Sequence, residues 1–283
     1  MKKLLVGLGI LLSLLVVVAT ALPTILHAAG LHPDYEGVQI GLPGKRALII
    51  TTSHSVLAPP GETEGSETGV MASEFTHPYY SFLDAGMDVD MASIQGGQIP
   101  IDPQTLSYVI RSPEDERYLK DSVAQAKVSN SFAIADVDIS QYDIVFISGG
   151  WGAAYDLAQS PLMATKVSEA YYGERTAVIG GVCHGVLGLV KAKDKEGNTL
   201  IAGRRMTGVT DKQIKELGIE MTPLHPEAEL RKAGALFESQ TAFRDLFATH
   251  VVVDDEQRFV TGQNQNSGLE TAHRMMQVIA GRG

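Results

Sequence analysis

The chain has 283 residues, of which 44% are hydrophobic and 20% are charged, and it carries a net charge of −10 at neutral pH. This length suits one large domain or two small ones, and the composition is that of an ordinary globular protein. The acidic balance argues against nucleic acid as a partner, and it provides no attraction to anionic lipid headgroups.

The N-terminus carries a long apolar segment behind two basic residues. Lys2 and Lys3 precede an apolar run from Leu4 to Leu26. As a helix, such a run is about 35 Å long and crosses the hydrocarbon core of a bilayer. We therefore expect residues 1–26 to be a transmembrane anchor or a signal peptide cleaved near Ala21; the run is longer than the usual signal core, which favours the anchor. Either way the lysines stay in the cytoplasm, so the rest is expected to be extracytoplasmic or secreted.

The remainder of the chain predicts a linker and then one domain. Residues 27–45 are rich in glycine and proline, which is typical of a linker, and the domain is expected over residues 46–283. Apolar and β-branched runs predict strands over residues 46–52, 88–94, 142–148, 176–179, 206–210, 250–254 and 258–261. Charged or amphipathic stretches predict helices over residues 70–85, 112–131, 153–172 with a break near Ser160-Pro161, 211–217, 226–233 and 268–279.

This order of elements predicts an α/β fold. Strands that alternate with helices indicate a flavodoxin-like sandwich, in which a mostly parallel sheet has helices on both faces. Functional sites in such folds lie at the carboxyl ends of the strands. Two glycine-rich turns are expected at such ends, Gly149-Gly150-Trp151-Gly152 and Gly181-Val182-Cys183-His184-Gly185.

The second of these turns has the pattern Gly-x-nucleophile-x-Gly, with Cys183 as the nucleophile. The pattern is typical of a nucleophile elbow, a sharp strand-to-helix turn that leaves no room for nearby side chains. Such a turn places the sulfur at a helix N-terminus, where backbone N–H groups and the helix dipole favour the thiolate. A buried structural cysteine is the alternative interpretation. Because the chain has one cysteine, an internal disulfide is impossible.

Four stretches together carry a family resemblance. They are Thr68-Gly69-Val70 with Glu74, His77 and Pro78; residues 148–152 with Tyr155 and Asp156; residues 181–185; and residues 261–264 with Ser267. Over roughly residues 45–280 the chain resembles the ThiJ/PfpI superfamily, whose fold is similar to that of class I glutamine amidotransferases. Within it, the chain is most similar to the heat-shock chaperone and glyoxalase III branch.

The resemblance implies a role for several residues. Glu74 would lie beside the Cys183 sulfur, hydrogen bond to it and carry protons, and His184 would be a general acid/base. The backbone N–H groups of Gly150 and His184 would form an oxyanion hole, next to Gly149 in the same pocket. The simpler alternatives are that Glu74 is an ordinary charge in the first turn of a helix, and that His184 only follows a turn.

The chain also departs from the family pattern. Trp151 stands where the family usually has histidine; tryptophan does not transfer protons, so we expect it to wall the pocket. The family glutamate that orients the histidine corresponds to Ile214. Asp211 or Glu216 is the candidate to replace it, and the alternative is that both are solvated helix charges. Near the end, the usual Asn-Pro is Asn264-Gln265. A complete catalytic triad is therefore not established by the sequence.

Another motif, His225-Pro226-Glu227, matches the His-x-Glu pair of glutamine amidotransferases but follows Cys183 too closely, so we interpret it as the start of a helix. No metal site is expected, because the histidines lack ligand spacing and one cysteine does not make a zinc site. No cofactor is expected either.

These observations predict a cysteine-dependent lyase of the glyoxalase III or D-lactate dehydratase kind. It would convert a small carbonyl such as methylglyoxal to a hydroxy acid without glutathione. An amidase or peptidase on the same elbow is one alternative. A non-catalytic stress chaperone or redox sensor is another, favoured by Trp151 and the missing acid. Besides the substrate, the expected partners are a membrane, through the N-terminal helix, and a second copy of the chain, because family members are often dimers.

Overall fold

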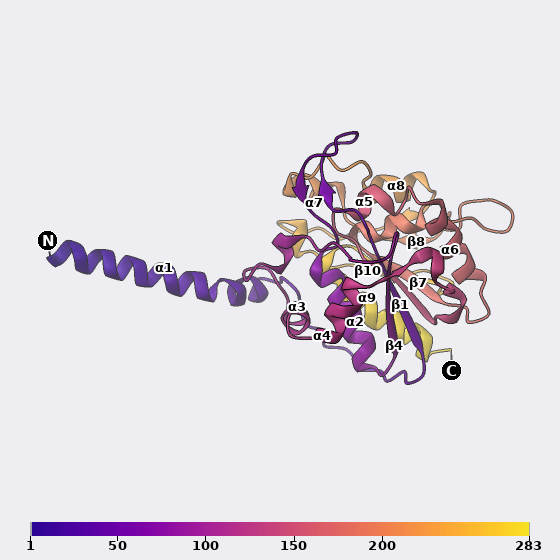
Figure 1. Ribbon diagram of the computed structural model, residues 1–283, viewed down its shortest axis with the longest axis horizontal. Helices are drawn as coiled ribbons and strands as arrows, with labels where there is room; N and C mark the ends of the chain where they lie inside the picture. The colour runs from indigo at the N-terminus through magenta and orange to yellow at the C-terminus, as the bar shows by residue number, and fades with distance from the viewer. Residues whose placement is uncertain (1, 283) are drawn as a thin grey trace.

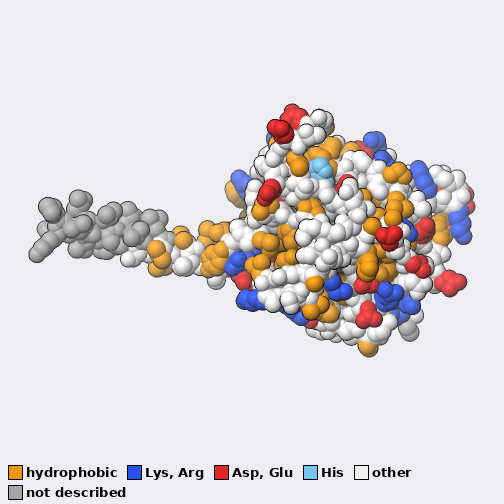
Figure 2. Space-filling view, in the orientation of Figure 1, with side chains coloured by type: hydrophobic (Ala, Val, Ile, Leu, Met, Phe, Trp, Pro, Cys, Tyr) orange, Lys and Arg blue, Asp and Glu red, His pale blue; other side chains and the backbone are white. Residues whose placement is uncertain are grey.

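The computed structural model describes the backbone of residues 2–282 and the side chains of residues 13, 14 and 16–282. Helix α1 (Lys2–Ala28) forms where the anchor or signal was expected, and it projects away from the rest of the molecule (Figure 1). Figure 2 shows hydrophobic side chains along the described part of this helix; the exposed ones are Leu14, Val16, Val17, Val18 and Ile25.

Within the predicted transmembrane span, the side chains of residues 1–12 and 15 lie outside the described part. Within the part of the chain that the structure describes, no helix is both long and apolar enough to cross a bilayer.

The centre of the domain is a seven-stranded sheet with the order β10-β11-β7-β6-β1-β4-β5. Its strands are β1 (Arg46–Thr51), β4 (Asp88–Ser93), β5 (Phe132–Ala133), β6 (Ile144–Ile147), β7 (Val178–Val182), β10 (Val251–Val253) and β11 (Phe259–Gly262). The strands pair in parallel except for β10 with β11, which confirms the predicted mostly parallel sheet. Because β6 and β7 are central neighbours, the two glycine-rich turns that follow them meet at one edge of the sheet.

Helices cover both faces of this sheet, as predicted (Figure 1). One face is covered by α2 (Ala72–Asp84) and α9 (Gly268–Ala280), together with α4 (Ser122–Ser129), which contacts β4 and α3 (Pro113–Tyr118). The other is covered by α5 (Ala153–Asp156), α6 (Pro161–Tyr172), α8 (Pro226–Lys232) and the 3₁₀ helix η4 (Cys183–Leu189). Helix α7 (Asp211–Leu217) and the small sheets β2–β3 (Val56–Leu57, Ser66–Glu67) and β8–β9 (Arg205–Met206, Leu236–Phe237) lie outside these layers.

The alternation of side chains along β1 shows why the sheet is buried on both faces. Ala47 and Ile49 pack into the core under α2 and α9, whereas Leu48 and Ile50 pack into the core under α5 and α6. Successive residues of a strand point to opposite faces, so a strand that is apolar throughout is suited only to a sheet covered on both sides.

Several predicted segments differ in detail from the structure, and two of these differences have a local cause. The single helix expected over residues 112–131 is two helices, because Asp121 interrupts it: its carboxylate accepts hydrogen bonds from the N–H groups of Val123 and Ala124 and so caps α4. The loop expected over residues 53–69 contains the short antiparallel pair β2–β3. Both features depend on a few residues that periodicity alone does not distinguish.

The segment expected to be a linker is packed against the domain. The backbone N–H of His32 donates to Asn266 Oδ1 at 2.8 Å, and the side chain of Leu31 is buried. Farther along, the Tyr35 ring stacks on His273 with 3.7 Å between the ring centroids. The segment therefore has a fixed position, and its first residues reach the functional site described below.

A buried ion pair gives the first testable prediction. Asp254 is buried and pairs with Arg204, and its other carboxylate oxygen accepts from the N–H groups of Arg258 and Phe259. We expect Asp254→Ala to lower the free energy of unfolding by about 3–5 kcal/mol, because it removes the buried partner of Arg204 and leaves the N–H groups of Arg258 and Phe259 without their acceptor. Glu256 pairs with the same arginine but is 61% exposed, so Glu256→Ala is the matched control and should cost less than about 1 kcal/mol. Urea denaturation of both variants measures the difference; equal losses would contradict the prediction.

Candidate active site

The chain turns sharply at Cys183, between β7 and η4. Cys183 has a φ of +56°, in the left-handed region that only glycine adopts without strain. A Cβ atom on Gly181 or on Gly185 would collide with the carbonyl oxygen of Ile147 in the neighbouring strand, so glycine is required on both sides. This is the predicted nucleophile elbow, with a 3₁₀ helix in place of an α-helix.

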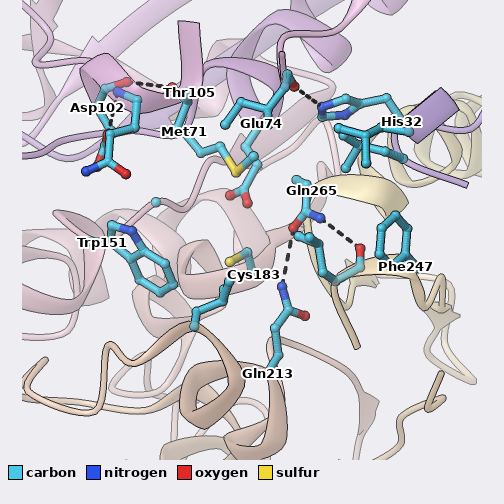
Figure 3. A pocket seen from close by; sticks show the side chains of 17 residues that line it. His32, Met71, Glu74, Asp102, Thr105, Trp151, Cys183, Gln213, Phe247 and Gln265 are labelled. Atoms are coloured by element: carbon cyan, nitrogen blue, oxygen red, sulfur yellow. Dashed lines mark hydrogen bonds between the residues drawn. The ribbon is translucent and has the colours of Figure 1, made fainter. Parts of the chain in front are cut away.

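Glu74 reaches this turn from the first turn of α2, far away in the sequence. Its side chain is fully buried, and its Oε2 atom accepts a hydrogen bond of 2.9 Å from the Gly149 N–H. The Ser148 hydroxyl donates to the Glu74 carbonyl oxygen at 2.9 Å, which holds α2 against the end of β6. Figure 3 shows the carboxyl group directed toward the Cys183 sulfur, with which it interacts. The structure thus brings Glu74 and Cys183 together, as the resemblance implied.

Burial and mutual interaction shift the pKa of both groups. Burial raises the pKa of Glu74 to about 8, against opposing hydrogen bonds from Cys183 and the backbone of Gly149. Burial, and then the charge of Glu74, raise the pKa of the Cys183 thiol well above its usual value. The prediction that the helix terminus favours the thiolate is therefore wrong: the N–H groups of His184 and Gly150 act in that direction, but burial dominates. The pair titrates as a unit, with a proton available to either group.

His184 lies beside the nucleophile in a fully buried position. Its Nδ1 atom is 3.4 Å from the Cys183 sulfur, and the edge of its ring packs against Trp151 with 5.2 Å between centroids. Burial lowers the pKa of His184 to about 3, so the ring is neutral at neutral pH. Its Nε2 atom has no hydrogen-bond partner among the described residues.

The acid that would orient this histidine is absent from the described residues around it. Ile214 is buried in the apolar core, as an isoleucine should be. The Asp211 carboxylate lies on the surface, 3.9 Å from His225, and Glu216 Oε2 accepts from the Asp245 N–H at 2.8 Å. Neither candidate replaces the family glutamate. The site therefore contains a cysteine, a histidine and a carboxyl group beside the sulfur, but these groups do not form a Cys-His-acid triad.

The glycine loop after β6 has two separate tasks. The N–H of Gly149 holds the Glu74 carboxylate, and a Cβ atom at this position would lie 2.5 Å from Glu74 Oε2. Gly150 has a φ of +89°, and its N–H, together with that of His184, points at the sulfur. An oxygen on a carbon bonded to the sulfur would lie near both donors, and the oxyanion hole that they would form stays a prediction.

Other motif residues hold loops and do not enter the site. Asp156 accepts hydrogen bonds from the Thr52 hydroxyl at 2.8 Å and the Ser53 N–H at 2.7 Å. Asn264 donates to the carbonyl oxygens of Asp245 and Ala248, which fixes the loop that precedes β10. His225 immediately precedes α8, as its motif was interpreted. No group of side chains suitable for a metal ion occurs in the described part of the chain.

A pocket of about 300 Å³ leads to the Cys183 sulfur (Figure 3). Trp151 forms part of its wall, as predicted. Sequence reasoning missed Leu31 and His32, which come from the presumed linker, and Leu246 and Phe247, which come from the C-terminal third of the chain. No local pattern marks these residues, because only the fold brings their segments to the pocket.

Glu74 also gives a prediction on stability. Its pKa rises from 4.5 in the unfolded chain to about 8, so between these pH values the folded state holds a proton that the unfolded state releases. Stability is therefore expected to fall as the pH rises through this window, by about 1.4 kcal/mol per pH unit from this group. In Glu74→Gln the fall in unfolding free energy between pH 5 and pH 8 should be smaller by a few kcal/mol. Urea denaturation at both pH values tests this, and equal pH slopes would contradict it.

Sequence and structure comparisons agree on the family. The pattern of the DJ-1/PfpI family matches residues 66–277. The chain belongs to the DJ-1/PfpI family. It is 28% identical over 243 residues to the glutathione-independent glyoxalase HSP31 of Saccharomyces cerevisiae, a match that covers 83% of this chain and 98% of that protein.

Two solved structures extend this family relationship. The Rapid Encystment Protein 24 KDa (REP24) of Francisella tularensis has 32% sequence identity and a TM-score of 0.74, covering 83% of this chain and 99% of that one. Glyoxalase III of Candida albicans has 26% identity and a TM-score of 0.72, covering 83% and 96%. The predicted resemblance to the glyoxalase III branch of this DJ-1/PfpI family is confirmed.

Proposed function

We propose that this protein is a glutathione-independent glyoxalase that converts a 2-oxoaldehyde such as methylglyoxal to the 2-hydroxy acid. The observation that carries the proposal is the buried pair of the Cys183 sulfur and the Glu74 carboxyl group at the end of a pocket. Relatives that carry the name of this activity, from Saccharomyces cerevisiae and Candida albicans, match most of the chain and support it.

The first step is addition of the Cys183 sulfur to the aldehyde carbon. In the form of the pair that holds a single proton, this proton passes from the sulfur to the ionised Glu74 and from there to the carbonyl oxygen, which becomes the hydroxyl group of a hemithioacetal. The N–H groups of Gly150 and His184, which point at the sulfur, stabilise the charge on that oxygen as it develops.

The second step moves a hydrogen between the two carbons. Glu74 removes the proton from the former aldehyde carbon, which gives an enediolate. The hydroxyl proton then moves from the oxygen of that carbon to the oxygen of its neighbour, and Glu74 returns its proton to the neighbouring carbon, which gives a thioester of the hydroxy acid. A carboxyl group with a pKa of about 8 is suited to take and return a proton near neutral pH. Water then cleaves the thioester and releases the acid and the free thiol. The sum is addition of one water molecule to the 2-oxoaldehyde, with no external oxidant or reductant.

The test is an assay of lactate formation from methylglyoxal without glutathione. We expect lactate in a molar ratio of about one to the methylglyoxal consumed, together with a thioester adduct on Cys183 when the reaction is quenched early. Methylglyoxal that disappears without lactate, as it would by modification of surface lysine and arginine, contradicts the proposal. An acyl adduct from amide substrates, with no lactate, would instead indicate the amidase alternative.

A stress protein without catalysis is the second candidate. It is favoured because no described residue supplies an acid to His184, whose Nε2 atom has no hydrogen-bond partner there. It predicts that the purified protein suppresses aggregation of a heat-denatured client equally well after Cys183→Ala. Loss of that protection in the variant would contradict it. Selective oxidation of Cys183 by peroxide would instead favour the redox sensor.

The location of the domain outside the cytoplasm, and its assembly as a dimer, belong to this proposal. The two lysines before the N-terminal apolar segment support the location. The intact mass of the protein isolated from cells shows whether cleavage near Ala21 occurs. Protease treatment of intact cells shows on which side of the membrane the domain lies, and light scattering measures its oligomeric state.

A further inference from the structure

Away from the sulfur, one wall of the pocket that leads to Cys183 is made of hydrocarbon side chains. Its apolar wall is made of Leu26, Leu31, Ile110, Leu217, Leu246 and Phe247. These residues come from α1 and the segment after it, from the loop after η1 (Pro103–Leu106), from α7, and from η5 (Asp245–Phe247). Five separate parts of the chain thus contribute an aliphatic or aromatic side chain to one wall.

The polar side chains of the pocket are either uncharged or already hydrogen-bonded to other groups of the protein. Burial lowers the pKa of His32 to about 4, so it carries no charge at neutral pH. Asp102 accepts hydrogen bonds from the Thr68 hydroxyl at 2.9 Å and the Gln104 N–H at 3.0 Å. Among the described residues that line the pocket, none is a lysine or an arginine. A phosphate or carboxylate on the far end of a substrate would therefore lose its hydration without a cation to compensate.

The size of the pocket also favours a substrate that is larger than methylglyoxal. A volume of about 300 Å³ is at the lower end of the range for pockets that enclose molecules much larger than a three-carbon carbonyl. Methylglyoxal bound at Cys183 leaves the apolar wall in contact with water. A longer hydrocarbon tail would displace that water, and each buried methylene group is worth about 0.8 kcal/mol, which is about fourfold in affinity.

We propose that the preferred substrate is a 2-oxoaldehyde with an uncharged hydrocarbon tail of several carbons. Its aldehyde lies at Cys183 and its tail lies against the apolar wall, where Leu31 and Leu217 contact it. This inference rests on the proposed function, because it assigns the substrate class of the same site. It also makes the segment after α1 a part of the binding pocket.

The first experiment compares methylglyoxal, propylglyoxal and hexylglyoxal as substrates of the full chain. We expect kcat/KM to rise with chain length, by about tenfold or more from methyl to hexyl. Leu31→Asn should lower the ratio of the hexyl to the methyl value by about tenfold. Val38→Asn is the matched control, since Val38 lies in the same segment but is 74% exposed, and it should leave the ratio unchanged.

A second variant keeps the test decisive if Leu31→Asn does not fold. Leu217 is at the end of α7 and is already 36% exposed, so Leu217→Gln should fold and should lower the same ratio. Circular dichroism establishes the folding of each variant. A ratio that is unchanged in folded Leu31→Asn and Leu217→Gln would overturn the assignment of the apolar wall.

The outcomes separate this inference from the proposed function. If methylglyoxal is converted and the longer substrates are no better, the inference fails and the proposed function stands. If no 2-oxoaldehyde is converted, the proposed function fails, and binding of acetone, pentanone and octanone decides the inference. Trp151, the single tryptophan of the chain, lines the pocket and reports binding by its fluorescence. Tighter binding of octanone, weakened by Leu217→Gln, supports the apolar wall; equal binding of the three ketones overturns it.

Discussion

Replacement of Cys183 by alanine is expected to lower kcat/KM for methylglyoxal by about 10⁴-fold or more, since removal of a nucleophile removes the covalent route altogether. Cys183 is the only cysteine of the chain, so no second thiol can substitute for it. Its side chain is small and packs in the core near the pocket, and we expect the variant to retain its fold by circular dichroism. Cys183→Ser is the companion variant and should be nearly as inactive, because a hydroxyl is a weaker nucleophile. Full turnover of methylglyoxal by folded Cys183→Ala would contradict the proposed chemistry.

Glu74→Gln is expected to lower kcat by about 10²–10⁴-fold, with a smaller effect on KM. The amide oxygen of glutamine still accepts the hydrogen bond from the Gly149 N–H, so the local structure should persist. What the variant loses is a group that takes up and returns a proton in both steps of the reaction.

The matched control for this variant lies at the other end of the same helix. Asp84 is 60% exposed and pairs with Arg117 on the surface. Asp84→Asn should change kcat less than twofold, because the carboxylate is far from the pocket and well solvated. A similar kcat in Glu74→Gln and in Asp84→Asn would remove Glu74 from the mechanism.

The sequence was most informative where the cause of the structure is local. Two glycines and a cysteine at the end of an apolar run predict a sharp turn, and the collision of a Cβ atom at Gly181 or Gly185 with Ile147 explains why. The strand β1 was predicted within one residue, since a run that is apolar at every position is suited only to a sheet buried on both faces.

The partners of the cysteine were predicted by resemblance and not by local pattern. No periodicity connects Glu74 to a residue more than a hundred positions away; the parallel order of β1, β6 and β7 brings them together. The direction of the thiol pKa was predicted wrongly because burial is a property of the folded chain, and here it outweighs the helix terminus. The wall formed by Leu31 and Phe247 was missed for the same reason: it exists only after distant segments dock.

The central claim is that Cys183 and Glu74 form one titrating pair, in which each group controls the protonation of the other. The most direct measurement is the rate of alkylation of Cys183 by iodoacetamide as a function of pH, followed by mass spectrometry of the intact protein. Because the charge of Glu74 raises the pKa of the thiol, Glu74→Gln should move the midpoint of this profile to lower pH. Profiles with the same midpoint in the two proteins would show that the carboxyl group does not act on the sulfur, which would contradict the account.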